Sequence, residues 1–445
     1  MTQGRTAPVS LYSIAFAFDG AGDAILLRDE RDDLLVGGTP EWTAAAGSRA
    51  LAAYARGAKP AIHVVLARPR NSASPGDREA DALEGGCTVW ATGAGGPGIE
   101  PLTIPLQADA EGFTPPLAFR LERLPDASGV LDVSWSWRAR VGSEEFAIGT
   151  SKHKICLTAG RPRDPAAWLG LRHPERVGLD AKGLPWTYSR IVEWTCEWAA
   201  GLEDDKAIVD AILWHLPRSG LKYAVHLEHN SVREMLFWGG GFCGAWARMF
   251  QAMAASQGVF VERRSFWVDW RLHRALEREC WCALVIGEGG VNRTEPNWDS
   301  NTWHDGDWPF DGKTVRDFTA KRYVFWGSPN KLVDGHTINV LSRSDGSHYL
   351  YDPSFVLGPI LLDRPLPASD PKKRVDVADL GTFGTHYLGS YEAYLLGVLP
   401  RASHASAGPV AKGPAHPRGD PLADGVTIPA GRLAPHRDAL TFFWT

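Results

Sequence analysis

The first third of the chain alternates apolar and polar residues, and this alternation restricts the possible folds most strongly. In Val130–Val141 (VLDVSWSWRARV) it runs through most of the segment, and a period of two is typical of a half-buried strand. Other segments with strand character are separated by clusters of Gly, Pro, Asp and Asn: Ser10–Phe18, Ala61–Ala67, Cys87–Thr92, Ala118–Arg123 and Glu145–Thr158. Short strands at such spacing predict an antiparallel β-sandwich.

The periodicity changes after residue 160. The segment Ala159–Trp186 contains four prolines and predicts a domain boundary. Helical spacing follows over Tyr188–Ala200 and Asp205–Leu216, which end at Gly201 and before Pro217. We therefore expect an α+β chain with a β-sandwich domain (1–160), an α+β domain (161–400) and a C-terminal segment (401–445).

The C-terminal segment has two parts. Residues 402–421 are rich in Ala, Pro, Gly, His and Ser, a composition that buries little surface and predicts a linker. The apolar end of residues 428–445 (LTFFWT) predicts a segment that docks on a domain.

Composition excludes several classes of protein. The chain has 445 residues, 44% of them hydrophobic, which excludes disorder of the whole chain. Its 47 Lys and Arg against 52 Asp and Glu give a net charge of −5, without a basic run that would favour nucleic acid or a membrane surface. There is no apolar stretch of membrane-spanning length and no signal-peptide pattern, so the expected location is the cytoplasm. The oligomeric state stays open.

Cysteine and tryptophan usage point to packing. The six cysteines are scattered and include no Cys-x-x-Cys pair, which excludes a disulfide framework and a zinc ribbon. Cys280 and Cys282 share a face of a strand-like run and are expected to be buried thiols. Most of the 19 tryptophans are expected to pack in cores and interfaces, with sugar stacking as the alternative.

One cysteine lies at the start of an amphipathic helix. Cys243 follows three glycines, and Trp246, Met249, Phe250, Met253 and Ala254 then recur at helical spacing up to Gly258. Unpaired backbone N–H groups and the positive end of the helix dipole favour an anion at this position, so the thiol ionises more readily there. A buried structural thiol is the alternative, because free cysteine often behaves as a small hydrophobe.

A base and an orienting acid follow further along the chain. His336 begins one expected strand, and a second strand ends in Asp352-Pro353 after a turn at residues 344–346. A three-residue loop with a left-handed Gly346 would place residue 338 opposite 352, and thus His336 diagonal to Asp352 on one face. A two-residue turn would put them on opposite faces. A catalytic pair therefore requires the three-residue loop.

These residues resemble the transglutaminase-like superfamily, which shares the papain-like arrangement. The Gly-x-Cys that opens a helix is matched by Gly241-Phe242-Cys243, and the Gly-Ile/Val about fifteen residues on by Gly258-Val259. The His that begins a strand and the later Asp-Pro are matched by His336 and Asp352-Pro353. The resemblance covers roughly residues 188–396 and implies an α+β domain in which the Cys-bearing helix packs on an antiparallel sheet.

The resemblance also implies a reaction. Cys243 would attack an amide carbonyl of a protein or peptide, His336 would protonate the leaving amine, and Asp352 would orient the imidazole, with no cofactor. Hydrolysis is expected rather than cross-linking, since Phe242 stands where cross-linking members have Gln. Trp238 is the candidate second oxyanion donor beside the Cys243 N–H, and Gly241, Phe242 and Trp246 are candidates for the substrate cleft. The alternative is an inert transglutaminase-like scaffold that only binds.

Two other features are expected to have no catalytic role. His226, Glu228 and His229 do not have the spacing of a zinc site, so no metal is expected. Residues 287–313 carry four aspartates, but their spacing is not that of a calcium loop. A long insertion of this kind predicts a lid or a specificity wall.

Overall fold

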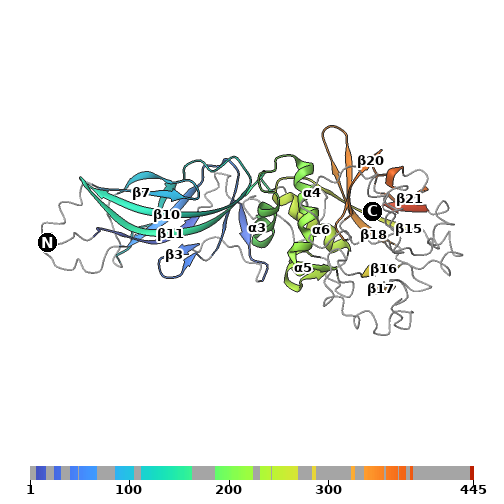
Figure 1. Cartoon of the computed structure of the whole chain (residues 1–445), viewed down its shortest axis with the longest axis horizontal. Coiled ribbons are helices and arrows are strands. Elements are labelled where there is room, and N and C mark those ends of the chain that lie inside the picture. Colours follow the sequence, from blue (N-terminus) through green and yellow to red (C-terminus); the bar gives the residue numbers. More distant parts are fainter. Residues whose placement is uncertain are drawn as a thin grey trace. The chain divides into compact units, whose positions relative to one another are not determined.

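The computed structural model describes most of the two folded regions of the chain (Figure 1). The residues described are 7–16, 25–31, 41–48, 50–67, 86–104, 112–162, 186–223, 231–241, 243–268, 283–286, 322–325, 335–354, 357–368, 370–376, 381–383 and 441–444. They divide into two compact units. Unit 1 comprises residues 1–205 and 255–259, and unit 2 comprises residues 206–254 and 260–445.

Unit 1 contains two five-stranded sheets. Figure 1 shows the long strands β7, β10 and β11 side by side in one of them. The first sheet has the order β4-β3-β1-β6-β9, with β1 Ser10–Phe16, β3 Trp42–Thr43, β4 Gly47–Ser48, β6 Ala61–Ala67 and β9 Leu117–Arg120. The second has the order β5-β11-β10-β7-β8, with β5 Ala52–Ala55, β7 Cys87–Ala94, β8 Ile99–Ile104, β10 Gly129–Val141 and β11 Glu144–Thr158. All pairs within these sheets are antiparallel except that of β5 with β11.

One hydrophobic cluster contains side chains from both of these sheets. Ile14 and Val64 come from the first sheet, and Val89, Trp135 and Ile155 from the second. The expected packing role of tryptophan is confirmed for β10, where Trp135 and Trp137 are buried and their rings meet edge to face at 6.2 Å. Burial of alternate residues on β10 is the cause of the period-two pattern in its sequence.

The six strands predicted from the alternation are confirmed, with ends that differ by a few residues. The prediction did not include the shorter strands β3, β4 and β5, nor β8. It also missed a parallel pair between β2 (Leu26–Arg28) and β12 (Trp186–Tyr188). Strands of two to four residues carry too little periodicity to be recognised locally.

Helix α3 (Ser189–Trp198) belongs to unit 1, whereas the sequence placed it in the second domain. The boundary differs because α3 is bonded to the strands. Glu193 forms an ion pair with Lys154 of β11 at 2.7 Å. Cys196 shares a buried cluster with Cys156 of β11.

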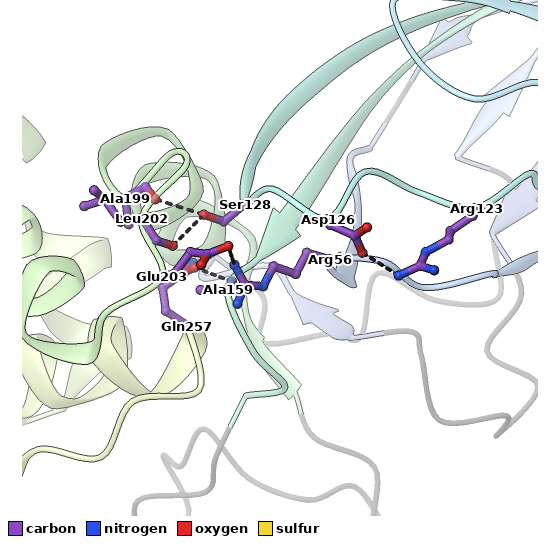
Figure 2. A network of polar contacts seen from close by, with 9 residues as sticks. All are labelled: Arg56, Arg123, Asp126, Ser128, Ala159, Ala199, Leu202, Glu203 and Gln257. Carbon is purple, nitrogen blue, oxygen red and sulfur yellow. Dashed lines mark hydrogen bonds and ion pairs between the residues drawn. The ribbon is translucent and has the colours of Figure 1, made fainter. Parts of the chain in front are cut away.

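A polar network holds the residues that follow α3 on the end of the sheet (Figure 2). The Ser128 hydroxyl donates to the carbonyl groups of Ala199 (3.0 Å) and Leu202 (3.3 Å), two residues in the turn after α3. Arg56 forms an ion pair with Glu203 at 2.9 Å. These contacts hold the turn after α3 against the residues that precede β10 and follow β5.

Residues 255–259 join the same unit through Gln257. Its Oε1 accepts from the backbone N–H of Ala159 at 3.0 Å (Figure 2), and its Nε2 donates to Thr195 Oγ1 at 2.9 Å. Gly258 has φ +82°, and a Cβ there would lie 2.8 Å from the carbonyl oxygen of Arg161. Only glycine fits this approach without displacement of the backbone.

Unit 2 combines helices with a six-stranded antiparallel sheet (Figure 1). The helices are α4 Asp205–His215, the 3-10 turn η2 Leu216–Ser219, α5 Val232–Trp238 and α6 Cys243–Ser256. The sheet order is β20-β19-β18-β15-β22-β21, with β15 Glu262–Val268, β18 Gly335–Ser342, β19 His348–Asp352, β20 Leu357–Leu362, β21 Asp370–Asp376 and β22 Thr441–Trp444. Two small pairs accompany it: β13 Lys222–Tyr223 with β14 Gly240–Gly241, and β16 Ala283–Ile286 with β17 Arg322–Phe325.

The expected docking of the apolar C-terminal end is confirmed. Strand β22 pairs with β15, with Trp444 opposite Phe266, and on its other side with β21. The expected helices α3, α4 and α6 are confirmed within two residues at each end, whereas α5 was not predicted. Among the described helices, none is both long and apolar enough to cross a membrane.

Candidate active site

The chain reaches Cys243 through a short helix and a tight glycine segment. Ser231 caps α5, because its side chain accepts from the N–H of Glu234 while the Glu234 carboxylate accepts from the N–H of Ser231. Gly239 ends α5 in the left-handed conformation, with φ 80°. The buried strand β14 follows, and after it Cys243 is the first residue of α6.

Cys243 differs from the other described cysteines in its exposure. It is half-buried, whereas Cys87, Cys156 and Cys196 are fully buried. Among the described cysteines, Cys243 thus has the most exposed surface, while the other three lie within the core of unit 1. Partial exposure at a helix N-terminus is typical of a reactive cysteine.

The expected buried stripe of α6 is confirmed. Trp246, Met249, Phe250, Met253 and Ala254 have no exposed surface. Trp246, a predicted candidate for the substrate cleft, is among these fully buried residues and packs at the first turn of the stripe. No hydrogen bond to its indole N–H is found among the described residues.

The hairpin has the register that a His–Asp pair requires. Asn339, Val340, Leu341 and Ser342 pair with Tyr351, Leu350, Tyr349 and His348. The Arg343 N–H donates to the Ser347 carbonyl, and Gly346 has φ 84°, so the loop contains the three residues 344–346 with a left-handed glycine. The predicted three-residue loop is confirmed. Continued by one residue, this register sets position 338 opposite Asp352 and leaves position 336 diagonal to it.

Asp352 is fully buried at the end of β19. Its Oδ1 accepts from the Ser354 N–H at 3.1 Å across the Asp-Pro-Ser turn. A buried carboxylate retains its charge only where donors or a cation compensate for the loss of water. This position thus suits a group that stabilises a neighbouring imidazolium.

Helix α6 runs in the same direction as β18. Asn339 Nδ2 donates to the Ala247 carbonyl at 3.1 Å, and one turn further along α6, Gln251 Nε2 donates to the Val261 carbonyl at 2.8 Å. Val261 precedes Glu262, which pairs with Val340, so the second contact lies further along β18 than the first. Cys243, one turn before Ala247, therefore lies toward the end of the sheet where β18 begins.

The three predicted residues thus lie toward the same end of the sheet, with His336 and Asp352 at positions whose parity is opposite to that of Asn339, which contacts α6. Cys243 begins α6, His336 is the second residue of β18, and Asp352 is the last residue of β19, which runs antiparallel to β18. His336 pairs with Phe266 in the backbone ladder. The side chain of His336 lies outside the described part of the structure, and no hydrogen bond to the Cys243 thiol is found within it.

Two contacts on this sheet were missed by the sequence reasoning. Asn339 is fully buried and bonded to α6, and Tyr351 donates to Asp210 of α4 at 2.8 Å while its ring lies 5.6 Å from that of Phe250. A lone amide within the apolar run after His336 was the signal that could have identified Asn339. Nothing local to Tyr351 points to a helix 141 residues away.

The face of β15 beside Asn339 is positively charged. Arg263 pairs with Asn339 in the ladder. Burial, and to a smaller extent the charge of Arg248 on α6, lower the pKa of Arg263 to about 10. At neutral pH this guanidinium still carries its charge.

The structure describes only some of the other residues that the sequence analysis singled out. Gly241 is buried in β14 and pairs with Tyr223. Trp238 is the last residue of α5, and its side chain is outside the described part of the chain, as is Phe242. Also outside it are His226, Glu228 and His229, the 287–313 insertion, Cys280, Cys282 and residues 402–421. Among described residues, no three His, Cys, Asp or Glu side chains are grouped closely enough to hold a metal ion.

No family model matches the sequence, and no curated protein does either. The class of the protein must therefore be argued from its residues and their placement.

Proposed function

We propose that this chain is a cysteine-dependent amidase or acyltransferase with a transglutaminase-like catalytic domain, acting on a carboxamide or peptide bond of a protein or peptide. What supports the proposal is that Cys243 begins α6 toward the end of the unit 2 sheet at which β18 begins and β19 ends, and that the hairpin has the register that a His–Asp pair between His336 and Asp352 requires. In the same proposal, unit 1 is a β-sandwich that precedes the catalytic domain in the chain.

The reaction follows from the chemistry of the three groups. The Cys243 thiolate attacks the carbonyl carbon, and the new C–S bond gives a tetrahedral oxyanion. The C–N bond then breaks, and the imidazolium of His336 transfers its proton to the leaving amine or ammonia. Water, or an amine in an acyl transfer, then attacks the thioester carbonyl and gives a proton to the neutral His336. The C–S bond breaks, Cys243 leaves as the thiolate, and the carboxylic acid or the new amide is released. Asp352 stabilises the imidazolium throughout.

The oxyanion needs donors that are in place before the reaction. The Cys243 N–H is one of the first four of α6 and has no acceptor within the helix. Trp238 remains the candidate for a second donor. Gly240 and Gly241, without Cβ atoms, allow a substrate backbone to approach closely.

One observation favours the alternative of an inert scaffold. The Asp352 carboxylate already accepts the Ser354 N–H and so stabilises the turn after β19, a role that requires no imidazole. The two functions differ in whether the charge of Asp352 affects Cys243. Asp352→Asn retains the acceptor oxygen for Ser354 and removes the charge, which makes it the discriminating substitution.

The test is the rate of iodoacetamide labelling at Cys243 as a function of pH, followed by peptide mass spectrometry. We expect fast labelling already at about pH 6, where an ordinary thiol with a pKa of about 8.5 is almost entirely protonated. His336→Ala and Asp352→Asn should both slow it. Cys87 is the internal control, since a fully buried thiol labels only when unit 1 unfolds.

Labelling that rises only above about pH 8 in the wild type, at the same rate as in His336→Ala, would contradict the enzyme and leave the scaffold. If the expected profile is found, glutamine- and asparagine-containing peptides should be screened for ammonia release, with amine incorporation as the readout that separates acyl transfer from hydrolysis.

A further inference from the structure

Two buried thiols of unit 1 meet where α3 packs on β11. Cys156 of β11 and Cys196 of α3 are fully buried, belong to one hydrophobic cluster, and are free thiols in this structure. The Cys156 thiol lies within hydrogen-bonding reach of the Cys196 thiol. Neither residue belongs to the proposed catalytic site, which lies in unit 2.

An ion pair on one side of the thiols fixes the alignment of α3 on β11. Lys154 and Cys156 lie on the same face of the strand, since residues two apart share a face. Glu193 and Cys196 are three apart on the helix and are neighbours on its surface. Lys154 and Glu193 form an ion pair at 2.7 Å. The thiols are the next pair along, about 6.6 Å further on the strand and about 4.5 Å further on the helix.

An amide holds the thiols from the other side. Gln257 Nε2 donates to Cys196 Sγ at 3.4 Å, and Gln257 Oε1 accepts from the N–H of Ala159 at 3.0 Å, three residues after Cys156. Because Gln257 is the donor to sulfur, this contact does not use the hydrogen of the Cys196 thiol. A bond between the two sulfur atoms would therefore leave both the ion pair and the amide bridge in place.

Two buried cysteines have a structural alternative, since free cysteine fills space as a small hydrophobe. Contact between the thiols is what distinguishes this pair. A disulfide forms without backbone movement only where the two side chains already point toward each other. Cys87, which is equally buried, belongs to a different cluster of unit 1 and lacks such a neighbour among the described cysteines.

We propose that Cys156 and Cys196 form a disulfide that ties α3 to β11 and stabilises unit 1, with a small-molecule disulfide such as oxidised glutathione as the electron acceptor. This inference does not rest on the proposed function. It assigns a covalent modification to residues that the proposed reaction does not use.

The bond forms by two successive exchanges. One cysteine thiolate attacks a sulfur atom of oxidised glutathione, the S–S bond of the glutathione breaks, and one glutathione thiolate leaves a mixed disulfide on the protein. The second cysteine thiolate attacks the protein sulfur of the mixed disulfide and releases the other glutathione thiolate. The two glutathione thiolates take up the two protons that the cysteines lost. Two protein thiols are thus oxidised and one glutathione disulfide is reduced.

These exchanges are expected while the chain folds, before α3 covers the strand. Neither thiol has exposed surface in the folded protein, so oxidised glutathione does not reach it there. The hydrogen bond with Cys196, together with burial, also raises the pKa of the Cys156 thiol. The attacking species is the thiolate, so the folded pair reacts slowly.

The test is to unfold the reduced full-length protein in urea, refold it in a glutathione redox buffer, and alkylate the remaining thiols before proteolysis. We expect mass spectrometry of the unreduced digest to show a peptide pair linked through Cys156 and Cys196. The linked protein should have a Tm about 5–15 °C above that of the reduced protein, because the bond closes a loop of about 40 residues. Reduced protein placed in the same buffer without unfolding should acquire the link more slowly.

Cys87→Ala is the matched control. Because Cys87 is a buried thiol of the same unit outside the cluster of Cys156 and Cys196, this variant should keep both the linked peptide pair and the difference in Tm. Cys156→Ala and Cys196→Ala should each lose both. If one of these two does not fold, the other gives the same reading from the opposite side of the bond.

Three outcomes would overturn the proposal. Alkylation of both Cys156 and Cys196 after refolding, or their linkage to other cysteines, would leave two thiols that only fill space. A linked pair whose Tm differs from that of the reduced protein by less than about 2 °C would exclude the stabilising role. A difference in Tm that persists in Cys156→Ala would place the source of the stabilisation at another cysteine.

Discussion

Two buried ionisable side chains in unit 1 should give opposite pH dependences of stability. The Glu41 carboxylate accepts from the Phe16 N–H at 2.8 Å, and burial raises its pKa to about 7. His153 lies between aromatic rings, 4.4 Å from Trp135 and 5.3 Å from Phe16, with Nε2 bonded to Ser151 Oγ. Burial lowers the pKa of His153 to about 3.

The signs follow from which state binds more protons. Between about pH 3 and 6.5 unfolded His153 is protonated while the native residue is not, so its contribution to stability falls as the solution is acidified. For Glu41 the native carboxyl retains its proton up to about pH 7 whereas the unfolded one loses it near 4.5, so stability rises on acidification through this window. From pH 7.5 to 4.5 each contribution changes by about 3 kcal/mol, in opposite directions.

The perturbation is to remove each group separately. In His153→Phe only Glu41 remains, and in Glu41→Gln only His153 remains. The free energy of unfolding is measured by urea titration at pH 7.5 and 4.5, with pulsed hydrogen exchange of peptides from β10 as the readout specific to unit 1. All other titrations are shared, so the change between the two pH values should differ between the variants by about 6 kcal/mol, with His153→Phe the more stabilised by acid.

The change in the free energy of unfolding between pH 7.5 and 4.5 should have a value in the wild type that lies between those of the two variants. A difference below about 2 kcal/mol, or the opposite order, would refute the reasoning, because it would mean that the two groups titrate at nearly their ordinary pKa values in the folded protein.

Two further predictions concern packing. Tyr351→Phe should lower the stability of unit 2 by about 1–2 kcal/mol in urea titration, because Asp210 loses a hydroxyl donor that lies 2.8 Å away; an unchanged midpoint would mean that water replaces the donor. Gly258→Ala should destabilise unit 1 by more than Gly201→Ala. Both glycines have positive φ, but a Cβ at Gly258 would meet the Arg161 carbonyl at 2.8 Å, whereas Gly201 has open space around it. Equal losses of Tm in Gly258→Ala and Gly201→Ala would show that the positive φ alone determines the loss of stability.

The sequence predicted those parts of the candidate site whose local structure depends on residues close by in the chain. The start of α6 at Cys243 follows from glycines before it and helical spacing after it. The turn of the hairpin follows from Ser344-Asp345-Gly346, whose glycine takes the left-handed conformation. The full burial of Trp246 could not be predicted, because its distance from Cys243 along the helix says nothing of which neighbours cover its side chain.

Sequence alone thus determined six strands of unit 1, the helix that begins at Cys243, and the position of the hairpin turn between His336 and Asp352. Tertiary structure alone decided that α3 packs on β11, that Thr441–Trp444 pairs with β15 across more than 170 residues, and that Asn339 bonds to Ala247. The physical reason is the separation in sequence over which each kind of interaction acts. Periodicity and turn chemistry express interactions among residues a few positions apart, whereas the pairing of distant segments depends on which surfaces of the whole chain bury each other best.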